Sequence, residues 1–282
     1  MIKDYTEDAR LADIKLIAVD MDLTLLADDG SQPEGMPERI AALAEAGVVF
    51  CPASGRPAPT LQMAFPEHAA EMAFCPDNGG DVLYKGESIH RSLMDPAIYQ
   101  AILCHAASEQ NAIPVLCCFD KAYVLDRDRA HRDALYKYYK DIRYVDTFEG
   151  VEFESDKCSI YFPEWDAEPR FREVYEPMFG EQVFITNAGR EWIDCMNTGV
   201  NKGSGIAHLC ERLGVDIADA AAVGDTYNDI PMLERVGHSF VVANAEEHMH
   251  EHAEFQVPSN NDRGVAVLID AILAAKGASA NK

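Results

Sequence analysis

Two aspartates at the end of an apolar run are the residues of this chain best placed to do chemistry. The segment from Leu16 to Val19 is apolar and partly β-branched, and Asp20 and Asp22 follow it. Such a run predicts a buried parallel strand whose carboxyl end opens on a loop, where open α/β sheets place functional groups. Side chains two residues apart in extended backbone point the same way, so we expect both carboxylates to converge. Their repulsion favours a bound metal ion or one raised pKa.

Three later segments place polar groups where a predicted strand ends or a predicted helix begins. One follows a short strand over 48–51, one opens a helix over 202–213, and one follows a strand over 220–223. Singly, each is explained by a solvated turn, a helix start or a capped helix terminus. The last segment holds two acids and an Asn, a set that suits a hard cation. The polar residues of the three segments include Ser54, Gly55, Arg56, Lys202, Asp225, Asn228 and Asp229.

The pattern of apolar and polar residues predicts two domains. Strands and helices alternate in residues 1–82 and 196–282, an order typical of a mainly parallel α/β sheet with right-handed crossovers. Residues 83–195 instead combine hairpins with helices, one of them near 130–139, which predicts an inserted α+β domain. Residues 276–282 have little to bury and are expected to form a frayed tail.

The charge balance limits the partners that this chain can have. It holds 24 lysines and arginines against 48 aspartates and glutamates, a formal net charge of -24. We therefore expect neither nucleic acid nor a membrane surface as a partner, because both are anionic. The same field opposes phosphorylated substrates. An enzyme that acts on them would need local positive charge from a cation, a lysine or backbone amides.

The cysteines and the apolar runs bear on the cellular compartment. The eight cysteines form no Cys-x-x-Cys pair and no zinc-ligand spacing, and free thiols fit a reducing cytoplasm. The N-terminal segment lacks the apolar centre of a signal peptide, and no apolar run is long enough to cross a membrane. We expect a soluble cytoplasmic protein of unknown oligomeric state.

The order of the polar segments along the chain is more informative than any one of them. In this order they resemble the motifs of the haloacid dehalogenase-like superfamily of phosphatases, in its Cof-type branch with a large α/β cap. The resemblance covers nearly the whole chain. The motifs that carry it are Asp20-Met-Asp22-Leu-Thr24, Ser54-Gly-Arg56, Lys202 and Gly224-Asp225-x-x-Asn228-Asp229, with Asn78-Gly79, Asn244-Ala245 and Gly264-Val265.

The resemblance implies a Rossmann-like core with an inserted cap and a Mg2+-dependent phosphatase. Small phosphorylated metabolites, such as sugar phosphates or phosphorylated cofactors, would be its substrates. Asp20 would attack phosphorus and carry an aspartyl phosphate, and Asp22 would protonate the leaving oxygen and then activate water. The alternatives are a phosphomutase on the same core and a phosphometabolite-binding module without turnover.

The resemblance also implies which residues bind the metal ion and the phosphate. Mg2+ would be held by Asp20, the backbone carbonyl of Asp22 and Asp225, with Asp229 helping directly or through water. Ser54 and nearby amides would bind the phosphoryl oxygens, and Lys202 would neutralise them. The remaining residues expected at the substrate are Thr24, Gly55, Arg56 and Asn228.

Several other features have simpler explanations. The residues His248, His250 and His252 suggest a second metal site, but a solvated acidic helix accounts for them. Adjacent Cys117 and Cys118 point to opposite faces of a predicted strand and are interpreted as packing residues.

Two features concern the surroundings of the expected site. Tyr136, Tyr138 and Tyr139 lie among basic residues, but interleaved acids cancel much of that charge. We interpret this cluster as cap surface, from which a few basic groups could meet a substrate anion. Leu23 stands where the family usually has glycine, and because leucine resists positive φ we expect a slightly different turn.

Overall fold

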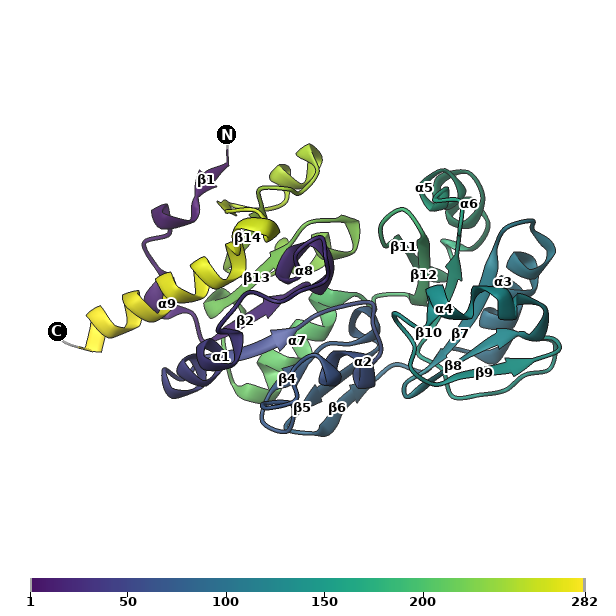
Figure 1. Cartoon of the computed structure of the whole chain (residues 1–282), viewed down its shortest axis with the longest axis horizontal. Coiled ribbons are helices and arrows are strands. Elements are labelled where there is room, and N and C mark those ends of the chain that lie inside the picture. The colour runs from purple at the N-terminus through teal and green to yellow at the C-terminus, as the bar shows by residue number, and fades with distance from the viewer. Residues whose placement is uncertain (1, 281–282) are drawn as a thin grey trace.

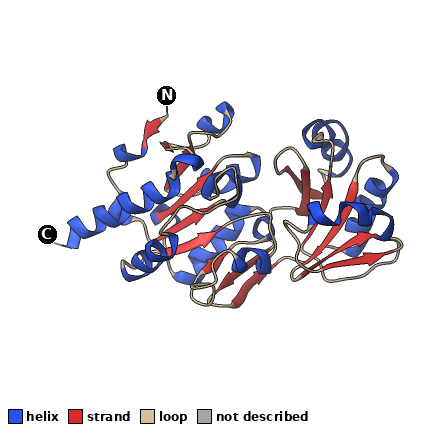
Figure 2. Ribbon diagram, in the orientation of Figure 1, coloured by secondary structure: helices blue, strands red, loops and turns tan. Residues whose placement is uncertain are grey.

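The computed structural model describes residues 2–280, and Figure 1 shows them as two bodies joined by two crossings of the chain. The larger body, which we call the core, holds both ends of the described chain. The smaller body, residues 92–197, is called the cap. Strands and helices are mixed in both bodies (Figure 2), which confirms the predicted α/β class.

The core is built on a six-stranded sheet in the order β1-β15-β14-β13-β2-β3. Every neighbouring pair in this sheet is parallel, as the alternating pattern predicts. A parallel sheet is covered on both faces, which explains why its central strands are almost wholly apolar. The strands are β1 (Lys3–Asp4), β2 (Leu16–Val19), β3 (Val49–Pro52), β13 (Ala220–Gly224), β14 (His238–Val242) and β15 (Phe255–Val257).

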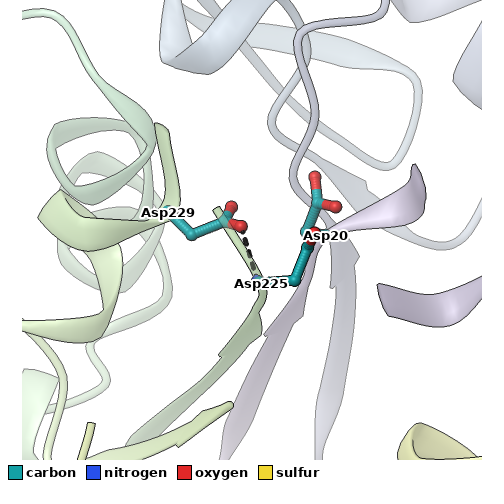
Figure 3. A group of neighbouring side chains, drawn as sticks. All are labelled: Asp20, Asp225 and Asp229. Carbon is teal, nitrogen blue, oxygen red and sulfur yellow. Dashed lines mark hydrogen bonds between the residues drawn. The ribbon is translucent and has the colours of Figure 1, made fainter. Parts of the chain in front are cut away.

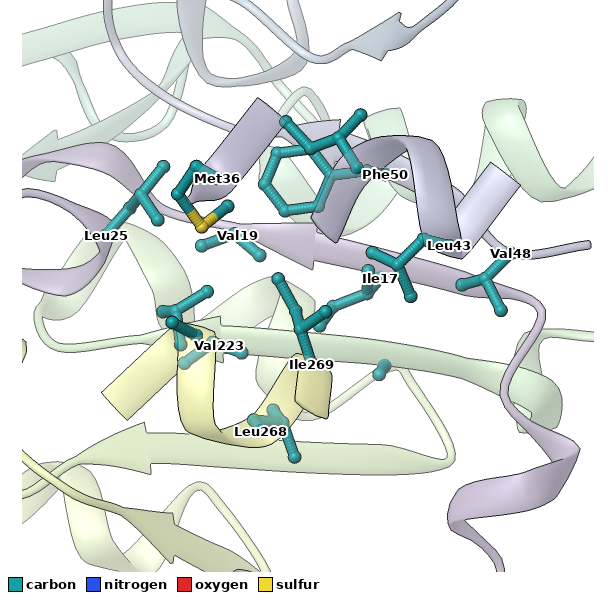
Figure 4. Close-up of a cluster of buried hydrophobic side chains, with 14 of the residues drawn as sticks. Ile17, Val19, Leu25, Met36, Leu43, Val48, Phe50, Val223, Leu268 and Ile269 are labelled. Carbon is teal, nitrogen blue, oxygen red and sulfur yellow. The ribbon is translucent and has the colours of Figure 1, made fainter. Parts of the chain in front are cut away.

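Helices pack on both faces of the core sheet. Ile17 and Val19 pack with α1 and α9, whereas Leu16 and Ala18 on the opposite face pack with α7 and α8. Figure 4 shows the first cluster, in which Ile269 of α9 faces Ile17 and Val223 of the sheet. The core helices are α1 (Met36–Glu45), α2 (Ala58–Met63), α7 (Lys202–Leu213), α8 (Ile230–Leu233) and α9 (Gly264–Ala280).

A small antiparallel sheet extends the core beside β3. It consists of β4 (Ala73–Phe74), β5 (Asp81–Tyr84) and β6 (Glu87–Arg91), and a parallel bridge from Ala53 to Cys75 connects it to the end of β3. The hairpin β5–β6 pairs with β4 and packs against α7. The predicted boundary near residue 82 stays a prediction, and this pairing favours a boundary after β6.

The cap contains a second six-stranded sheet in the order β11-β12-β10-β7-β8-β9, antiparallel except for the β8–β9 pair. One face packs on α3 and the α5–α6 segment, and the other face packs on α4. The elements are α3 (Pro96–Ser108), β7 (Ile113–Cys118), β8 (Lys121–Leu125), α4 (Arg132–Leu135), β9 (Ile142–Val145), β10 (Lys157–Tyr161), α5 (Ala167–Arg170), α6 (Glu176–Phe179), β11 (Val183–Asn187) and β12 (Trp192–Asn197).

Two connecting segments join the cap to the core, one after β6 and one after β12. The side-chain amide of Asn197 donates to Oγ of Ser92 at 2.9 Å and to the backbone oxygen of Leu93 at 2.8 Å. The two connecting segments are therefore tied to each other at the junction.

Some local predictions differ from the structure. The helix expected over 130–139 is shorter in the structure. A 3-10 turn over Asp126–His131 leads into the four-residue α4, which ends at Leu135. The expected tail at 276–282 is helical as far as Ala280, and Lys276 donates to the backbone oxygen of Ala12 at 3.0 Å. Residues 281 and 282 lie outside the described residues.

The turn that follows β2 contains a leucine in the left-handed region. Leu23 has φ 61° and ψ 5°, and its side chain is half exposed. The side-chain amide of Asn244 donates to the backbone oxygen of Leu23 at 2.8 Å and holds this conformation. Leucine therefore adopts a positive φ despite the crowding of its Cβ, and a slight difference from the family's turn stays a prediction.

Replacing Leu23 by glycine removes this crowding and exposes little apolar surface. We expect Leu23→Gly to change the free energy of unfolding by between zero and about +1 kcal/mol, since relief of strain exceeds the added freedom of the unfolded chain. Urea unfolding measures this change. Leu93→Gly is the matched control, because Leu93 is equally exposed at 50% against 49% but does not have a positive φ. An equal loss of stability in both variants would contradict the strain at Leu23.

Candidate active site

The ends of two neighbouring parallel strands bring three acids together. Asp20 follows β2 and Asp225 follows β13, and these strands pair so that Val19 lies beside Val223. Asp229 reaches the same place from the turn after β13, as Figure 3 shows. One carboxylate oxygen of each acid lies within 4.8 Å of the others, and all three residues are buried. Three of the predicted site residues are therefore neighbours.

Lys202 places a positive charge among these acids. It is the first residue of α7 and is fully buried, and its amine donates to Oδ1 of Asp20 at 2.5 Å and to Oδ1 of Asp229 at 2.6 Å. Burial alone lowers the pKa of Lys202, but Asp20 and Asp229 outweigh burial and raise the pKa above its ordinary value. Lys202 therefore stays cationic at neutral pH.

The three acids carry more negative charge than Lys202 can balance. Burial raises the pKa of Asp20 to about 7, against the lowering effect of Lys202. Burial also raises the pKa of Asp225, and repulsion from Asp20 and Asp229 adds to this effect. A divalent cation would supply the missing positive charge. Because every atom that could bind the cation is a carboxylate oxygen, these residues fit a hard cation such as Mg2+.

The segment after β13 is shaped so that Asp229 turns back towards the start of its own loop. Oδ2 of Asp229 accepts hydrogen bonds from the backbone nitrogens of Asp225 at 2.9 Å and Thr226 at 3.1 Å. A Cβ on Gly224 would lie 2.5 Å from the Cβ of Asp229, which is closer than real side chains allow. Glycine is therefore required at residue 224 by close packing.

Asp22 lies outside the group of three acids. Nε and Nη2 of Arg56 donate to the two oxygens of its carboxylate at 2.9 and 2.5 Å, and the Asp22 side chain is half exposed. The Asp22 carboxylate is therefore not part of the candidate metal cluster, although its charge adds to burial and to Asp229 in raising the pKa of Asp20. The convergence of the two carboxylates on one small volume stays a prediction. The turn over Met21–Leu25 begins directly after Asp20, although Asp22 itself keeps extended backbone with φ -76° and ψ 126°. Binding of a metal ion by the backbone carbonyl of Asp22 stays a prediction.

The residues expected to bind phosphate lie near this edge of the sheet, but several are paired with other protein groups. The Thr24 hydroxyl donates to Oδ1 of Asp225 at 2.8 Å, so it supports an acid of the candidate metal site. Ser54 is buried, and its Oγ accepts from the backbone nitrogen of Arg56 at 3.2 Å. The amide of Asn228 donates to Oδ1 of Asn78 at 3.1 Å.

Sequence reasoning missed two buried charged residues of the cap that contact the core. Lys157 begins β10 and is 1% exposed, and Asp194 lies in β12 and is 3% exposed. The signal was present in β10, where Lys157 and Ser159 alternate with the apolar residues Cys158 and Ile160. When a strand is buried, polar side chains along one of its faces indicate that this face contacts other polar groups of the protein and not solvent.

The tyrosine cluster is only in part cap surface. Tyr136 is 42% exposed, but Tyr139 is buried in the cap. The ring of Tyr138 lies 5.5 Å from the guanidinium carbon of Arg56, so this tyrosine faces the core. The cap-surface interpretation is therefore wrong for Tyr138 and Tyr139, because aromatic rings with polar tips pack well at such a junction.

The histidine segment and the paired cysteines have structural roles. Residues Glu247–Glu251 form a 3-10 turn, not the expected helix, and His248 stacks on Tyr227. Within residues 2–280 the acidic group described above is the only candidate metal cluster, and it contains none of these histidines. Cys117 and Cys118 pack in clusters on opposite faces of the cap sheet, which confirms their interpretation as packing residues.

Comparison with known proteins matches most of this chain to phosphatases. A family model described as haloacid dehalogenase-like hydrolase matches residues 17–269. The chain is 30% identical to 5-amino-6-(5-phospho-D-ribitylamino)uracil phosphatase YbjI of Escherichia coli K12, over 92% of this chain and 96% of the relative. It is also 25% identical to YwtE of Bacillus subtilis 168, which is named as the same kind of phosphatase, over 92% of this chain and 98% of that relative.

The solved structures show the same fold. The crystal structure of SMU.1108c from Streptococcus mutans UA159 superposes with a TM-score of 0.85 at 24% identity, and the match covers 93% of this chain and 99% of that chain.

None of the helices described in residues 2–280 combines the length and the hydropathy needed to cross a membrane.

The buried amine of Lys202 is expected to contribute strongly to stability. We expect Lys202→Met to lower the free energy of unfolding by about 3–5 kcal/mol, because Asp20 and Asp229 lose the cation that both contact. Urea unfolding without divalent metal measures the change. Lys15→Met is the control, since Lys15 pairs with Asp219 at 2.7 Å on the surface and is expected to cost at most about 1 kcal/mol. A similar loss of unfolding free energy in the two variants would show that the buried ion pairs of Lys202 stabilise the fold no more than a surface ion pair does.

Proposed function

The chain belongs to the haloacid dehalogenase-like hydrolases and is a phosphatase of the Cof-type branch, and we propose that it hydrolyses small phosphorylated metabolites with Mg2+ through an aspartyl phosphate. The observation that carries this proposal is the buried group of Asp20, Asp225, Asp229 and Lys202. It joins a carboxylate nucleophile, a set of oxygen ligands and a fixed cation at one edge of the core sheet.

In the proposed first step, a carboxylate oxygen of Asp20 attacks phosphorus and the bond to the ester oxygen breaks. The leaving oxygen takes a proton from Asp22. In the second step Asp22 accepts a proton from water, the water oxygen bonds to phosphorus, and the bond from phosphorus to Asp20 breaks. Inorganic phosphate leaves, and both carboxyl groups return to their first states.

Two groups neutralise the charge that collects on phosphorus. Lys202 is fixed beside the attacking carboxylate by its contacts with Asp20 and Asp229. When bound by Asp20, Asp225 and Asp229, Mg2+ would supply further positive charge to the phosphoryl oxygens. These groups provide the local positive charge that a protein with a formal net charge of -24 needs to accept an anionic substrate.

The contact between Asp22 and Arg56 sets a condition on the proposed proton transfer. Both oxygens of Asp22 accept hydrogen bonds from Arg56, and a carboxylate in such a pair only accepts. Asp22 must release at least one of these bonds before it carries a proton to the leaving oxygen. Because its side chain is half exposed, Asp22 has room for this movement.

The relatives suggest the first substrate to test. Two similar proteins are named for a phosphorylated ribitylamino-uracil, which joins a phosphorylated polyol chain to a pyrimidine ring. We propose this class of phosphate ester as the substrate, with sugar phosphates as the comparison set.

The eight cysteines are free, which supports a cytoplasmic location.

Asp20→Asn tests the proposed nucleophile. With Mg2+ and an aryl phosphate, the wild type is expected to release inorganic phosphate. The variant should lose activity by about 1,000-fold or more, because an amide is a poor nucleophile. Asp13→Asn is the control, since Asp13 is exposed and lies outside the site. Full activity in Asp20→Asn would exclude the mechanism, and isomerised sugar phosphate without release of phosphate would favour a phosphomutase.

A second experiment tests the metal ion without relying on turnover. Mg2+ is expected to raise the melting temperature of the wild type by about 5 °C or more, because binding to the folded state stabilises it. Asp225→Asn should lose most of this gain, since it removes one of the carboxylate ligands. Differential scanning calorimetry at constant ionic strength measures both. An equal gain in the variant would show that Mg2+ acts elsewhere.

A further inference from the structure

A cluster of buried charged groups lies between the cap and the core, and the proposed mechanism uses none of them. Lys157 and Asp194 come from the cap, and Asp77 comes from a core loop. All three are at most 3% exposed. Charges of this kind are stable in a folded protein only when they are paired or hydrogen-bonded, so their contacts indicate what the cluster does.

Lys157 reaches from the cap to two loops of the core. Its amine donates a short hydrogen bond to the backbone oxygen of Gly55, the residue after Ser54. It also lies 3.2 Å from Oδ1 of Asp77 and 3.6 Å from Oδ2 of Asp194. Burial by itself lowers the pKa of Lys157, but Asp194 and its other neighbours more than reverse this, so the net pKa is raised. One cation of the cap therefore holds the loop of the predicted phosphate site.

Asp194 connects the cap to the loop that holds the metal ligands. Its Oδ1 accepts from Ser159 at 2.5 Å, and its Oδ2 accepts from the amide of Asn78 at 2.7 Å. The oxygen of that amide accepts in turn from Asn228, which precedes Asp229. A continuous chain of hydrogen bonds thus runs from the cap sheet to Asn228, the neighbour in sequence of Asp229.

The fit between the two bodies is close at this place. A Cβ on Gly55 would lie 3.0 Å from Oδ2 of Asp194, so a larger residue at position 55 would press on the Asp194 carboxylate. If the cap moved away, Lys157 would leave the backbone oxygen of Gly55, and Asp194 would leave the amide of Asn78. Water would then solvate these charges. The contacts exist only while cap and core are together.

We propose that Lys157 and Asp194 are positioning residues that clamp the cap onto the loops of residues 54–56 and 77–78. In the clamped state the first loop presents Ser54 to the phosphate, and Asn228 is fixed beside the acids through Asn78. When the cap is open, both loops lose these partners. The kinetic part of this inference rests on the proposed phosphatase activity, whereas the clamp itself can be measured without turnover.

Three variants test the clamp by small-angle X-ray scattering, with and without Mg2+ and vanadate as a phosphate analogue. Lys157→Met and Asp194→Asn are expected to have a larger radius of gyration than the wild type and to respond less to vanadate. Lys157→Arg keeps the charge and should recover part of the closure. The matched controls are Lys121→Met and Asp141→Asn, which alter cap ion pairs of 2.8 and 2.7 Å on the surface.

Steady-state kinetics provide the second measurement on the same variants. We expect kcat to fall by about 10- to 100-fold in Lys157→Met and Asp194→Asn, because loops that are misplaced by an ångström lose alignment. The fall in kcat should exceed any change in KM, and the controls should match the wild type. A role in stability alone would lower the melting temperature without changing kcat at 25 °C.

The possible outcomes separate the clamp from the proposed function. An unchanged radius of gyration and an unchanged kcat in Asp194→Asn would overturn the clamp, even if Lys157→Met fails to fold. If the wild type hydrolyses no phosphate ester, the proposed function fails. The scattering data then decide the clamp alone: an opened Asp194→Asn supports it, and a closed one overturns it.

Discussion

The ion pairs of Lys202 with Asp20 and Asp229 are the constraint on which the rest of the active site depends. Lys202 is the first residue of α7, and the positive end of a helix dipole is an unfavourable place for a buried cation. The two carboxylates at 2.5 and 2.6 Å offset this cost. Because Asp20 and Lys202 stand on opposite sides of the cap in the sequence, the pair also joins the two halves of the core. The site is therefore complete only when both halves of the core are in place.

The strand pattern predicted the parallel core, and the resemblance to a known family predicted the meeting of Asp20, Asp225, Asp229 and Lys202. Parallel strands end at the same edge of a sheet, so residues far apart in sequence become neighbours through topology alone. The position of Asp22 was not predictable, because a turn follows the strand and Arg56 supplies a partner from another loop. Contacts of this kind depend on side-chain rotamers, which carry no periodic signal.

The contacts across the junction were the least predictable part of the molecule. The polar face of β10 indicates a protein contact for Lys157, but it does not say that the partners of Lys157 and Asp194 are Gly55, Asp77 and Asn78 of the core. The tyrosine cluster shows the same limit, since Tyr138 faces Arg56 while Tyr136 is exposed. Neither the local propensity nor the spacing of residues predicts how the cap is placed on the core.

The hydrogen bonds of Asn197 to Ser92 and Leu93 determine how the junction can bend. The two connecting segments lie side by side there, so a displacement of the cap that pulled one segment away from the other would break both hydrogen bonds of the Asn197 amide. A displacement that carried both segments together would keep them. The link thus couples the entry of the chain into the cap to its return to the core.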